Sequence, residues 1–208
     1  MKTPTRPYAQ RARAQAAEAT GRRIVEAFLA RLLAQWFDEI TLDRVAADAG
    51  VTVQTVVRRF GGKEALLATA VDTLAVRILA QRGAPPGDLE RLVDNLLGDY
   101  EQTGDAVIRL LALEPRHPVL KPFLDRGRTQ HRQWAARAFA DRLDQLPAAS
   151  RQRALDQLVI ITDVYTWKLL RRDMARSLNA TAATLKEFLQ GALLRFSQPK
   201  HQSKTNTV

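Results

Sequence analysis

The chain contains no cysteine, only three histidines and no long apolar run. The lack of cysteine excludes disulfides, thiolate catalysis and cysteine-bound zinc or iron–sulfur clusters. His117, His131 and His201 match no metal-ligand spacing, so neither a metal nor another cofactor is expected. The longest apolar stretches, such as residues 158–161, are far shorter than the roughly 18 residues of a membrane span, and no signal-peptide core is present. These absences favour a cytoplasmic protein without a membrane partner.

The residues that are present suit a folded, all-α protein. A length of 208 residues allows one or two domains, and 46% hydrophobic and 26% charged residues are ordinary for a globular chain. Apolar residues recur every three or four positions almost everywhere, and no segment shows the strict alternation of a half-buried strand. The pattern therefore predicts about nine helices and no sheet.

Positive charge is concentrated at the N-terminal end. The whole chain has 32 basic and 22 acidic residues, and the first 23 residues hold six basic side chains against Glu18 alone. Those six are Lys2, Arg6, Arg11, Arg13, Arg22 and Arg23. Such a segment attracts polyanions. The alternative is a solvated, flexible leader that binds no partner. Residues 1–20 are interpreted as a basic N-terminal arm.

Capping residues and helix breakers divide the remainder into expected elements. The expected helices run from about Arg11 or Gly21 to Asp38, over 42–49, 53–60 and 63–81, from Asp88 to a turn at Gly104, over 105–113 and 119–146, from Ser150 to Arg172, and from Asn179 to Phe196. The Gly-Ala-Pro-Pro-Gly segment at 83–87 is the strongest loop signal. The polar tail at 197–208 is expected to be disordered.

The two shortest helices, over 42–49 and 53–60, have the features of a helix-turn-helix. Two-turn helices do not stand alone and must pack on a neighbour. Thr41 and Thr52 occupy N-cap positions, and Gly50 suits the positive φ of the tight turn between the helices. One apolar seam faces inward, formed by Leu42, Val45, Val51, Val56 and Phe60 with the small residues Ala46 and Ala49. Six residues are left facing largely outward, as in a recognition helix: Val53, Gln54, Thr55, Val57, Arg58 and Arg59.

In this segment the sequence resembles the TetR family of bacterial regulators. The residues that carry the resemblance are Thr41, Val45-Ala46, Ala49-Gly50-Val51-Thr52, Phe60, Lys63-Glu64 and Leu66, in the family's register over roughly residues 20–70. One departure is Val57, which replaces the family's usual tyrosine, a common phosphate contact. Arg58 or Arg59 is the candidate to take over that anchoring.

The resemblance implies an operator-binding homodimer that reads a palindrome in double-stranded DNA and responds to a small-molecule effector. It implies that Gln54, Thr55, Val57 and Arg58 approach base edges, with Val53 beside them, where glutamine suits adenine and arginine suits guanine. The residues expected at phosphates are Thr41, Arg44, Thr52, Arg59 and Lys63. The basic arm is expected to reach the adjacent minor groove or backbone.

Residues 21–66 are thus predicted to form the DNA-binding domain, and residues 67–196 a ligand-binding and dimerisation domain. The expected interface between two subunits comprises Leu158, Thr162, Tyr165, Leu169, Leu185, Phe188, Leu189 and Leu193. The same spacing is equally typical of residues that close the domain's own core. The candidate ligand pocket comprises Tyr100, Arg109, His117, His131, Trp134 and Phe139. Each of these aromatic residues is also compatible with plain core packing.

Two other classes of protein compete with a regulator. An enzyme is disfavoured because the sequence has no Gly-rich phosphate loop, no glutamate-x-x-histidine pair and no nucleophile elbow. A helical interaction or ligand-binding protein, in which the helix-turn-helix is only structural, does not need the polar residues Gln54, Thr55 and Arg58 on an outward face. A regulator is therefore the leading interpretation, and the expectation that it is a repressor comes from the resemblance.

Overall fold

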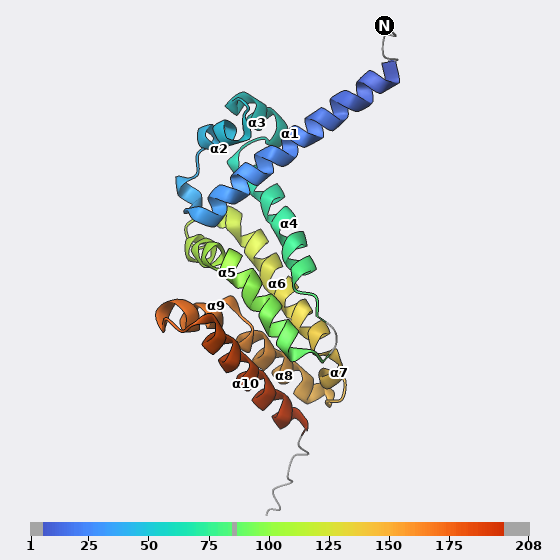
Figure 1. The fold of residues 1–208 in the computed structure, drawn as a ribbon, viewed down its shortest axis with the longest axis vertical. Coiled ribbons are helices and arrows are strands. Elements are labelled where there is room, and N and C mark those ends of the chain that lie inside the picture. Colours follow the sequence, from blue (N-terminus) through green and yellow to red (C-terminus); the bar gives the residue numbers. More distant parts are fainter. Residues whose placement is uncertain (1–5, 85–86, 198–208) are drawn as a thin grey trace, which may run out of the picture. The chain divides into compact units, whose positions relative to one another are not determined.

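The computed structural model describes residues 6–84 and 87–197, and these are helical with no strand among them (Figure 1). The elements in chain order are α1 Arg6–Ala34, η1 Phe37–Glu39, α2 Leu42–Ala49, α3 Val53–Phe60, α4 Lys63–Gln81, α5 Leu89–Leu113, η2 Pro118–Leu120, α6 Lys121–Ala138, α7 Ala140–Leu143, α8 Ala148–Ile161, α9 Val164–Lys168, η3 Leu169–Asp173 and α10 Leu178–Ser197. The predicted all-α class is confirmed. None of the described helices is both long and apolar enough to cross a bilayer.

The chain divides into two compact units that do not follow the predicted boundary after residue 66. The first unit takes its described residues from Met1–Ala80 and Asp105–Asp125, and the second takes them from Gln81–Gly104 and Arg126–Val208. The difference arises because apolar residues at the end of α5 and in η2, including Leu110, Leu113 and Leu120, join the core of the helix-turn-helix. The spacing of apolar residues in the sequence does not indicate that residues 105–125 pack with the first unit.

The first unit is organised around the apolar face of α1. Ile24, Phe28 and Leu32 are 0–1% exposed and pack with Val45 of α2 and Val56 of α3, both 0% exposed. Each such side chain contributes about 1.5–3 kcal/mol when it is fully withdrawn from water. The four-residue spacing of Ile24, Phe28 and Leu32 is therefore the pattern that positions the two short helices.

Polar side chains fix the same helices at the edge of this core. Arg31 of α1 pairs with Asp48 of α2 at 2.6 Å between Nε and Oδ2. Arg23 donates from Nε to the carbonyl oxygen of Ala49 at 3.3 Å, which satisfies an acceptor at the end of α2. These contacts join α1 to α2, and the spacing of residues in the sequence does not predict them.

The first helix is longer at its start and shorter at its end than predicted. It begins at Arg6, so residues 6–20 of the predicted arm continue α1 instead of forming a separate extended segment (Figure 1). The segment is rich in alanine, which favours this continuation. At the other end α1 stops at Ala34, and the predicted last turn is the separate 3₁₀ turn η1. Residues 1–5 of the arm and 198–208 of the predicted tail lie outside the described residues.

Gly104 was expected in a turn, but it lies inside the continuous helix α5. A Cβ atom placed at this glycine would meet Cζ3 of Trp167 at 2.5 Å. The indole of Trp167 is 0% exposed, and its Nε1 donates to Oε1 of Glu101 at 2.9 Å. The glycine is therefore explained by a close helix–indole contact, and the two helices expected over 88–113 are one.

Two helices predicted as continuous are interrupted in the structure. The segment expected over 119–146 divides at Phe139 into α6 and the short α7. The segment expected from Ser150 to Arg172 begins at Ala148, ends as α8 at Ile161, and resumes at Val164, where Asp163 caps α9 by accepting from the backbone N–H of Tyr165 at 2.8 Å. Asp163 is an N-cap residue placed within an apolar pattern, which hides the break from a periodicity argument.

Candidate nucleic-acid interface

Helix α2 has the termini that the sequence predicts. The hydroxyl of Thr41 accepts from the backbone N–H of Arg44, with 3.4 Å between N and Oγ1. Gly50 ends the helix in the left-handed region at φ 63°, and its N–H donates back to the carbonyl of Ala47 at 3.1 Å. A side chain at this φ would be strained, so glycine is required for the tight turn.

Helix α3 is capped in the same way and is fixed by one fully buried residue. Thr52 accepts from the N–H of Thr55 at 3.2 Å, and the two hydroxyl oxygens lie 3.0 Å apart. Val56 is 0% exposed, while Phe60 is half-buried against the same core. Gly61 closes the helix at φ 84°. The apolar seam therefore packs into the core of the first unit as predicted.

The opposite face of α3 is open to solvent. Gln54 and Arg58 are exposed, and Val57 retains 42% of its surface between them. No hydrogen bond or ion pair engages Arg58 in the part of the chain that the structure describes. An exposed valine flanked by an exposed amide and an exposed guanidinium has the chemistry of a base-reading face, in which a methyl-rich side chain meets thymine and the polar ones meet purines.

Two of the other predicted base-side residues are less open. Val53 is half-buried and packs against the core, so its predicted outward placement is only partly correct. Thr55 is half-buried, and its hydroxyl lies at hydrogen-bonding distance from that of Thr52. Both side chains serve the start of α3 as much as its outer face.

The predicted phosphate-side residues fall into two groups. Thr41, Arg44 and Thr52 are exposed at the beginnings of α2 and α3, where free backbone N–H groups and the helix dipole favour an anion. Arg59 is exposed, and its guanidinium lies against Gly21 of α1, which has no side chain to obstruct it. Sequence reasoning missed this link between the recognition helix and α1, although a glycine inside a helical pattern is a usable signal for close packing.

Lys63 is committed to its own unit in the structure. Its Nζ donates to the carbonyl oxygen of Asp38 at 3.3 Å and lies 4.4 Å from the centre of the Phe37 ring. Burial lowers the pKa of the Lys63 ammonium, and the nearby Asp38 carboxylate opposes that shift. A phosphate contact by Lys63 therefore requires it to leave these partners.

Three of the six predicted ligand-pocket residues surround a buried ion pair in the second unit. Arg82 donates through Nε to Oδ2 of Asp99 at 2.7 Å and through Nη2 to the same oxygen. Its guanidinium carbon lies 4.9 Å from the Tyr100 ring centre and 5.6 Å from that of Trp134. The space among these aromatic residues is thus occupied by Arg82, whose burial no local sequence pattern indicates.

His131 completes the network in a defined tautomer. Because Arg82 can only donate, Nδ1 of His131 accepts from its Nη1 at 3.1 Å, and Nε2 carries the proton toward the hydroxyl of Thr162 at 3.2 Å. That hydroxyl donates in turn to the carbonyl of Leu158 at 2.7 Å. Burial, with the adjacent Arg82 charge, lowers the pKa of His131 to about 4. The imidazole is therefore neutral at ordinary pH.

Burial also raises the pKa of the Tyr100 phenol, which donates to the carbonyl of Thr162 at 2.9 Å. Tyr100, His131 and Trp134 thus lie around Arg82 in a filled polar core, and a ligand-binding role for them stays a prediction. Phe139 lies elsewhere in the second unit, on the wall of a cavity.

Arg109 and His117 belong to the first unit, whereas the other four predicted pocket residues belong to the second. Arg109 donates from Nη2 to the carbonyl of Leu33 at 2.7 Å and so caps the end of α1. The ring of His117 lies edge-on to that of Phe37, with 6.0 Å between centres. Both side chains thus make their contacts with the end of α1 and with η1, and a role for them at a ligand site stays a prediction.

The predicted dimer residues separate into buried and exposed sets. Four of them, namely Leu158, Thr162, Leu185 and Leu189, are 0–1% exposed within the single chain. Such side chains have no surface left for a second subunit, so their assignment to an interface was wrong and the alternative of core packing holds. Tyr165, Leu169 and Phe188 remain 57%, 51% and 53% exposed, and Leu193 is half-buried.

Known proteins resemble this chain in both sequence and structure. An HTH-type transcriptional repressor of Streptomyces coelicolor is 31% identical over 97 residues, which are 47% of this chain and half the length of that repressor. The crystal structure of a transcriptional regulator from Rhodococcus sp. Rha1 superposes with a TM-score of 0.67 at 15% identity, covering 86% of this chain and 99% of that one. At that identity the second match concerns the fold alone.

Residues 30–70 match the family described as bacterial regulatory proteins, tetR family. This range includes the end of α1, both short helices and the beginning of α4, so it covers the residues on which the resemblance was first recognised. The matched proteins are described as regulators, and none of these descriptions names a catalytic activity. The family match therefore concerns the N-terminal helix-turn-helix segment, which is similar to that of the tetR family of bacterial regulatory proteins.

Proposed function

We propose that the protein is a transcriptional regulator that binds a palindromic operator as a homodimer and represses transcription until a small-molecule effector releases it. The observation that carries the proposal is the exposed face of α3, where Gln54, Val57 and Arg58 stand together on a helix fixed from behind by Val56. A rigidly held polar helix face is what direct reading of the major groove requires. Because the ligand is chromosomal DNA, we expect the protein to act in the cytoplasm.

Backbone contacts are expected from residues around this face. Arg44 and the N-caps Thr41 and Thr52 are exposed beside it, and Arg59 continues it toward α1. The helical start of α1 adds the exposed Arg11 and Arg13 to the same unit. Contacts of this kind set the register on DNA without choosing the sequence, and they make binding strongly dependent on salt.

Dimerisation is supported by apolar side chains left uncovered on α8 and α10. Ile160 is 64% exposed and Phe188 is 53% exposed, and both line a shallow groove together with Gly191. Apolar residues of this size gathered on one face are typical of a subunit interface. A symmetric pair would place two copies of α3 on two half-sites about one helical turn of DNA apart.

The repressor relative supports repression as the direction of control, and the effector remains part of the proposal by likeness to the family. Enrichment of bound sites from a random duplex library, at moderate salt, tests the proposed sequence-specific binding by a dimer. We expect a short inverted repeat, because a palindrome reports both sequence reading and pairing of subunits. Recovery of no sequence above bulk DNA would overturn the proposal and favour a protein in which the helix-turn-helix is structural only.

A further inference from the structure

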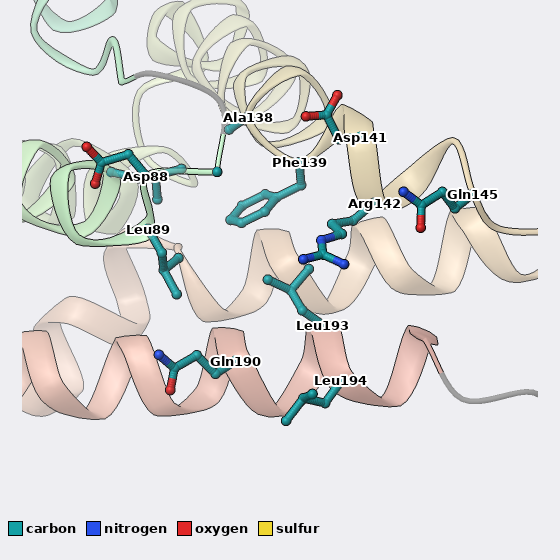
Figure 2. Close-up of a pocket in the computed structure, with 12 residues that line it drawn as sticks. Asp88, Leu89, Ala138, Phe139, Asp141, Arg142, Gln145, Gln190, Leu193 and Leu194 are labelled. Carbon is teal, nitrogen blue, oxygen red and sulfur yellow. The ribbon is translucent and has the colours of Figure 1, made fainter.

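A cavity of about 710 Å³ lies in the second unit, where α5 begins, α6 passes into α7, and α10 approaches its end (Figure 2). This volume falls within the roughly 300–1,000 Å³ of typical small-molecule sites. The buried cluster around Arg82 is separate from it, since Tyr100, His131 and Trp134 are absent from its lining. The cavity therefore differs from the pocket expected from the sequence.

The walls of this cavity are mainly apolar. Leu92 and Phe139 form its floor and are each 6% exposed, while Leu89 and Leu193 are half-buried beside them. Leu194 stands at the rim with 67% of its surface exposed. A hollow with an apolar floor and an uncovered apolar rim favours an occupant that is itself largely apolar.

The side chain of Arg142 is directed toward the apolar residues of the cavity. Figure 2 shows the guanidinium of Arg142 turned toward Phe139 and Leu193, and within the described residues it makes no hydrogen bond or ion pair.

The acidic side chains of the lining do not neutralise this cation. Asp88 accepts from the backbone N–H of Arg91 at 2.9 Å, which commits it to capping α5. The carboxylate of Asp141 points away from Phe139 (Figure 2). The polar handle presented to an occupant is therefore the positive charge of Arg142, and the lining also holds the neutral amides of Gln145 and Gln190.

We propose that this cavity binds a small molecule with an apolar body and one anionic group of the carboxylate or sulfonate type, which Arg142 pairs while the leucines and Phe139 cover the body. Arginine presents a planar fork of donors that matches a carboxylate, and the Arg142 side chain is exposed and therefore accessible to one. Use of this site as the effector site rests on the proposed regulatory function, whereas the binding itself does not.

The test uses the full chain without DNA. The probe is 8-anilinonaphthalene-1-sulfonate, an aromatic sulfonate whose fluorescence rises in an apolar site, and it is displaced in separate titrations by octanoate and by 1-octanol. We expect octanoate to displace the probe at lower concentration than the equally long neutral alcohol. Equal displacement by the two compounds would overturn the assignment of an anionic group.

Two charge-matched variants locate the binding. Arg142→Gln should weaken octanoate about tenfold or more and leave octanol unchanged, because only the paired charge is lost. Arg153→Gln, at an exposed position on α8 outside the cavity lining, removes the same charge and should change neither. An octanoate affinity that is the same in both variants and the parent, at unchanged melting temperature, would refute the site. Failure to select a DNA sequence would leave this result standing.

Discussion

Two glycines on the same helix allow the close packing of α5 on Trp167 to be measured. Gly98 is exposed, and a Cβ atom added there meets nothing within 4 Å. Gly104 is buried, and a Cβ atom there would lie 2.5 Å from Cζ3 and 2.7 Å from Cη2 of Trp167. The same substitution by alanine therefore meets open space at one position and an aromatic ring at the other.

The two substitutions are expected to change the free energy of unfolding differently. Both substitutions gain about 0.8–1.0 kcal/mol of helix propensity, because alanine replaces glycine in a helix interior. Only Gly104→Ala must move the indole, at a cost of about 1–3 kcal/mol for overpacking. Moving the ring also disturbs the bond from its Nε1 to Glu101. Gly98→Ala should therefore stabilise by nearly 1 kcal/mol, and Gly104→Ala should be destabilising or at best neutral.

Urea unfolding followed by circular dichroism measures both values. Since the two variants share the propensity term, the difference between their free energies of unfolding isolates the packing cost of about 1–3 kcal/mol at Gly104. Gly104→Ala as stabilising as Gly98→Ala would show that the indole has room to move, and the explanation of this glycine by close packing would be abandoned.

Three further outcomes are expected. Gln54→Ala or Arg58→Ala should each reduce discrimination at one base pair by about 1–3 kcal/mol, measured as relative affinity for single-substitution operators. The pKa of His131 is lowered to about 4 in the folded chain, whereas an unperturbed histidine has a pKa near 6.5. Between these two pH values the folded chain binds fewer protons than the unfolded chain. The stability that His131 contributes is therefore present above about pH 6.5 and is lost as the pH falls toward 4, by up to about 3 kcal/mol. Melting curves of the parent and His131→Gln test this, and an unchanged pH slope in the variant would contradict it. Asp99→Asn should cost about 3–5 kcal/mol because Arg82 remains buried without its counter-ion, whereas Arg82→Met combined with Asp99→Leu should cost less in the same unfolding assay.

The helix-turn-helix was predictable because its determinants are local. Thr41 and Thr52 act within one turn of their own helices, Gly50 acts at its own backbone, and the buried Val56 follows from helical spacing. Here sequence pattern, capping and packing agree, which is the condition under which a sequence specifies its structure most clearly.

The second half was less predictable because its determinants are distant in sequence. Nothing near Arg82 indicates that Asp99 and His131, 17 and 49 residues away, will receive it in a core. Helical spacing also failed to separate Leu189, which is buried, from its exposed neighbour Phe188, since both belong to an apolar pattern. Periodicity indicates a face of a helix, but burial depends on what packs against that face.

The central claim is that the exposed face of α3 chooses the DNA sequence. Its most direct test is the ratio of the dissociation constant for unrelated duplex to that for the enriched operator, measured at one salt concentration. We predict a ratio of about 10³ or more for the parent and for Arg153→Gln, and a fall toward equality when Gln54, Val57 and Arg58 are all replaced by alanine while binding to unrelated DNA persists. A triple variant that folds normally and retains the parent's ratio would contradict the account.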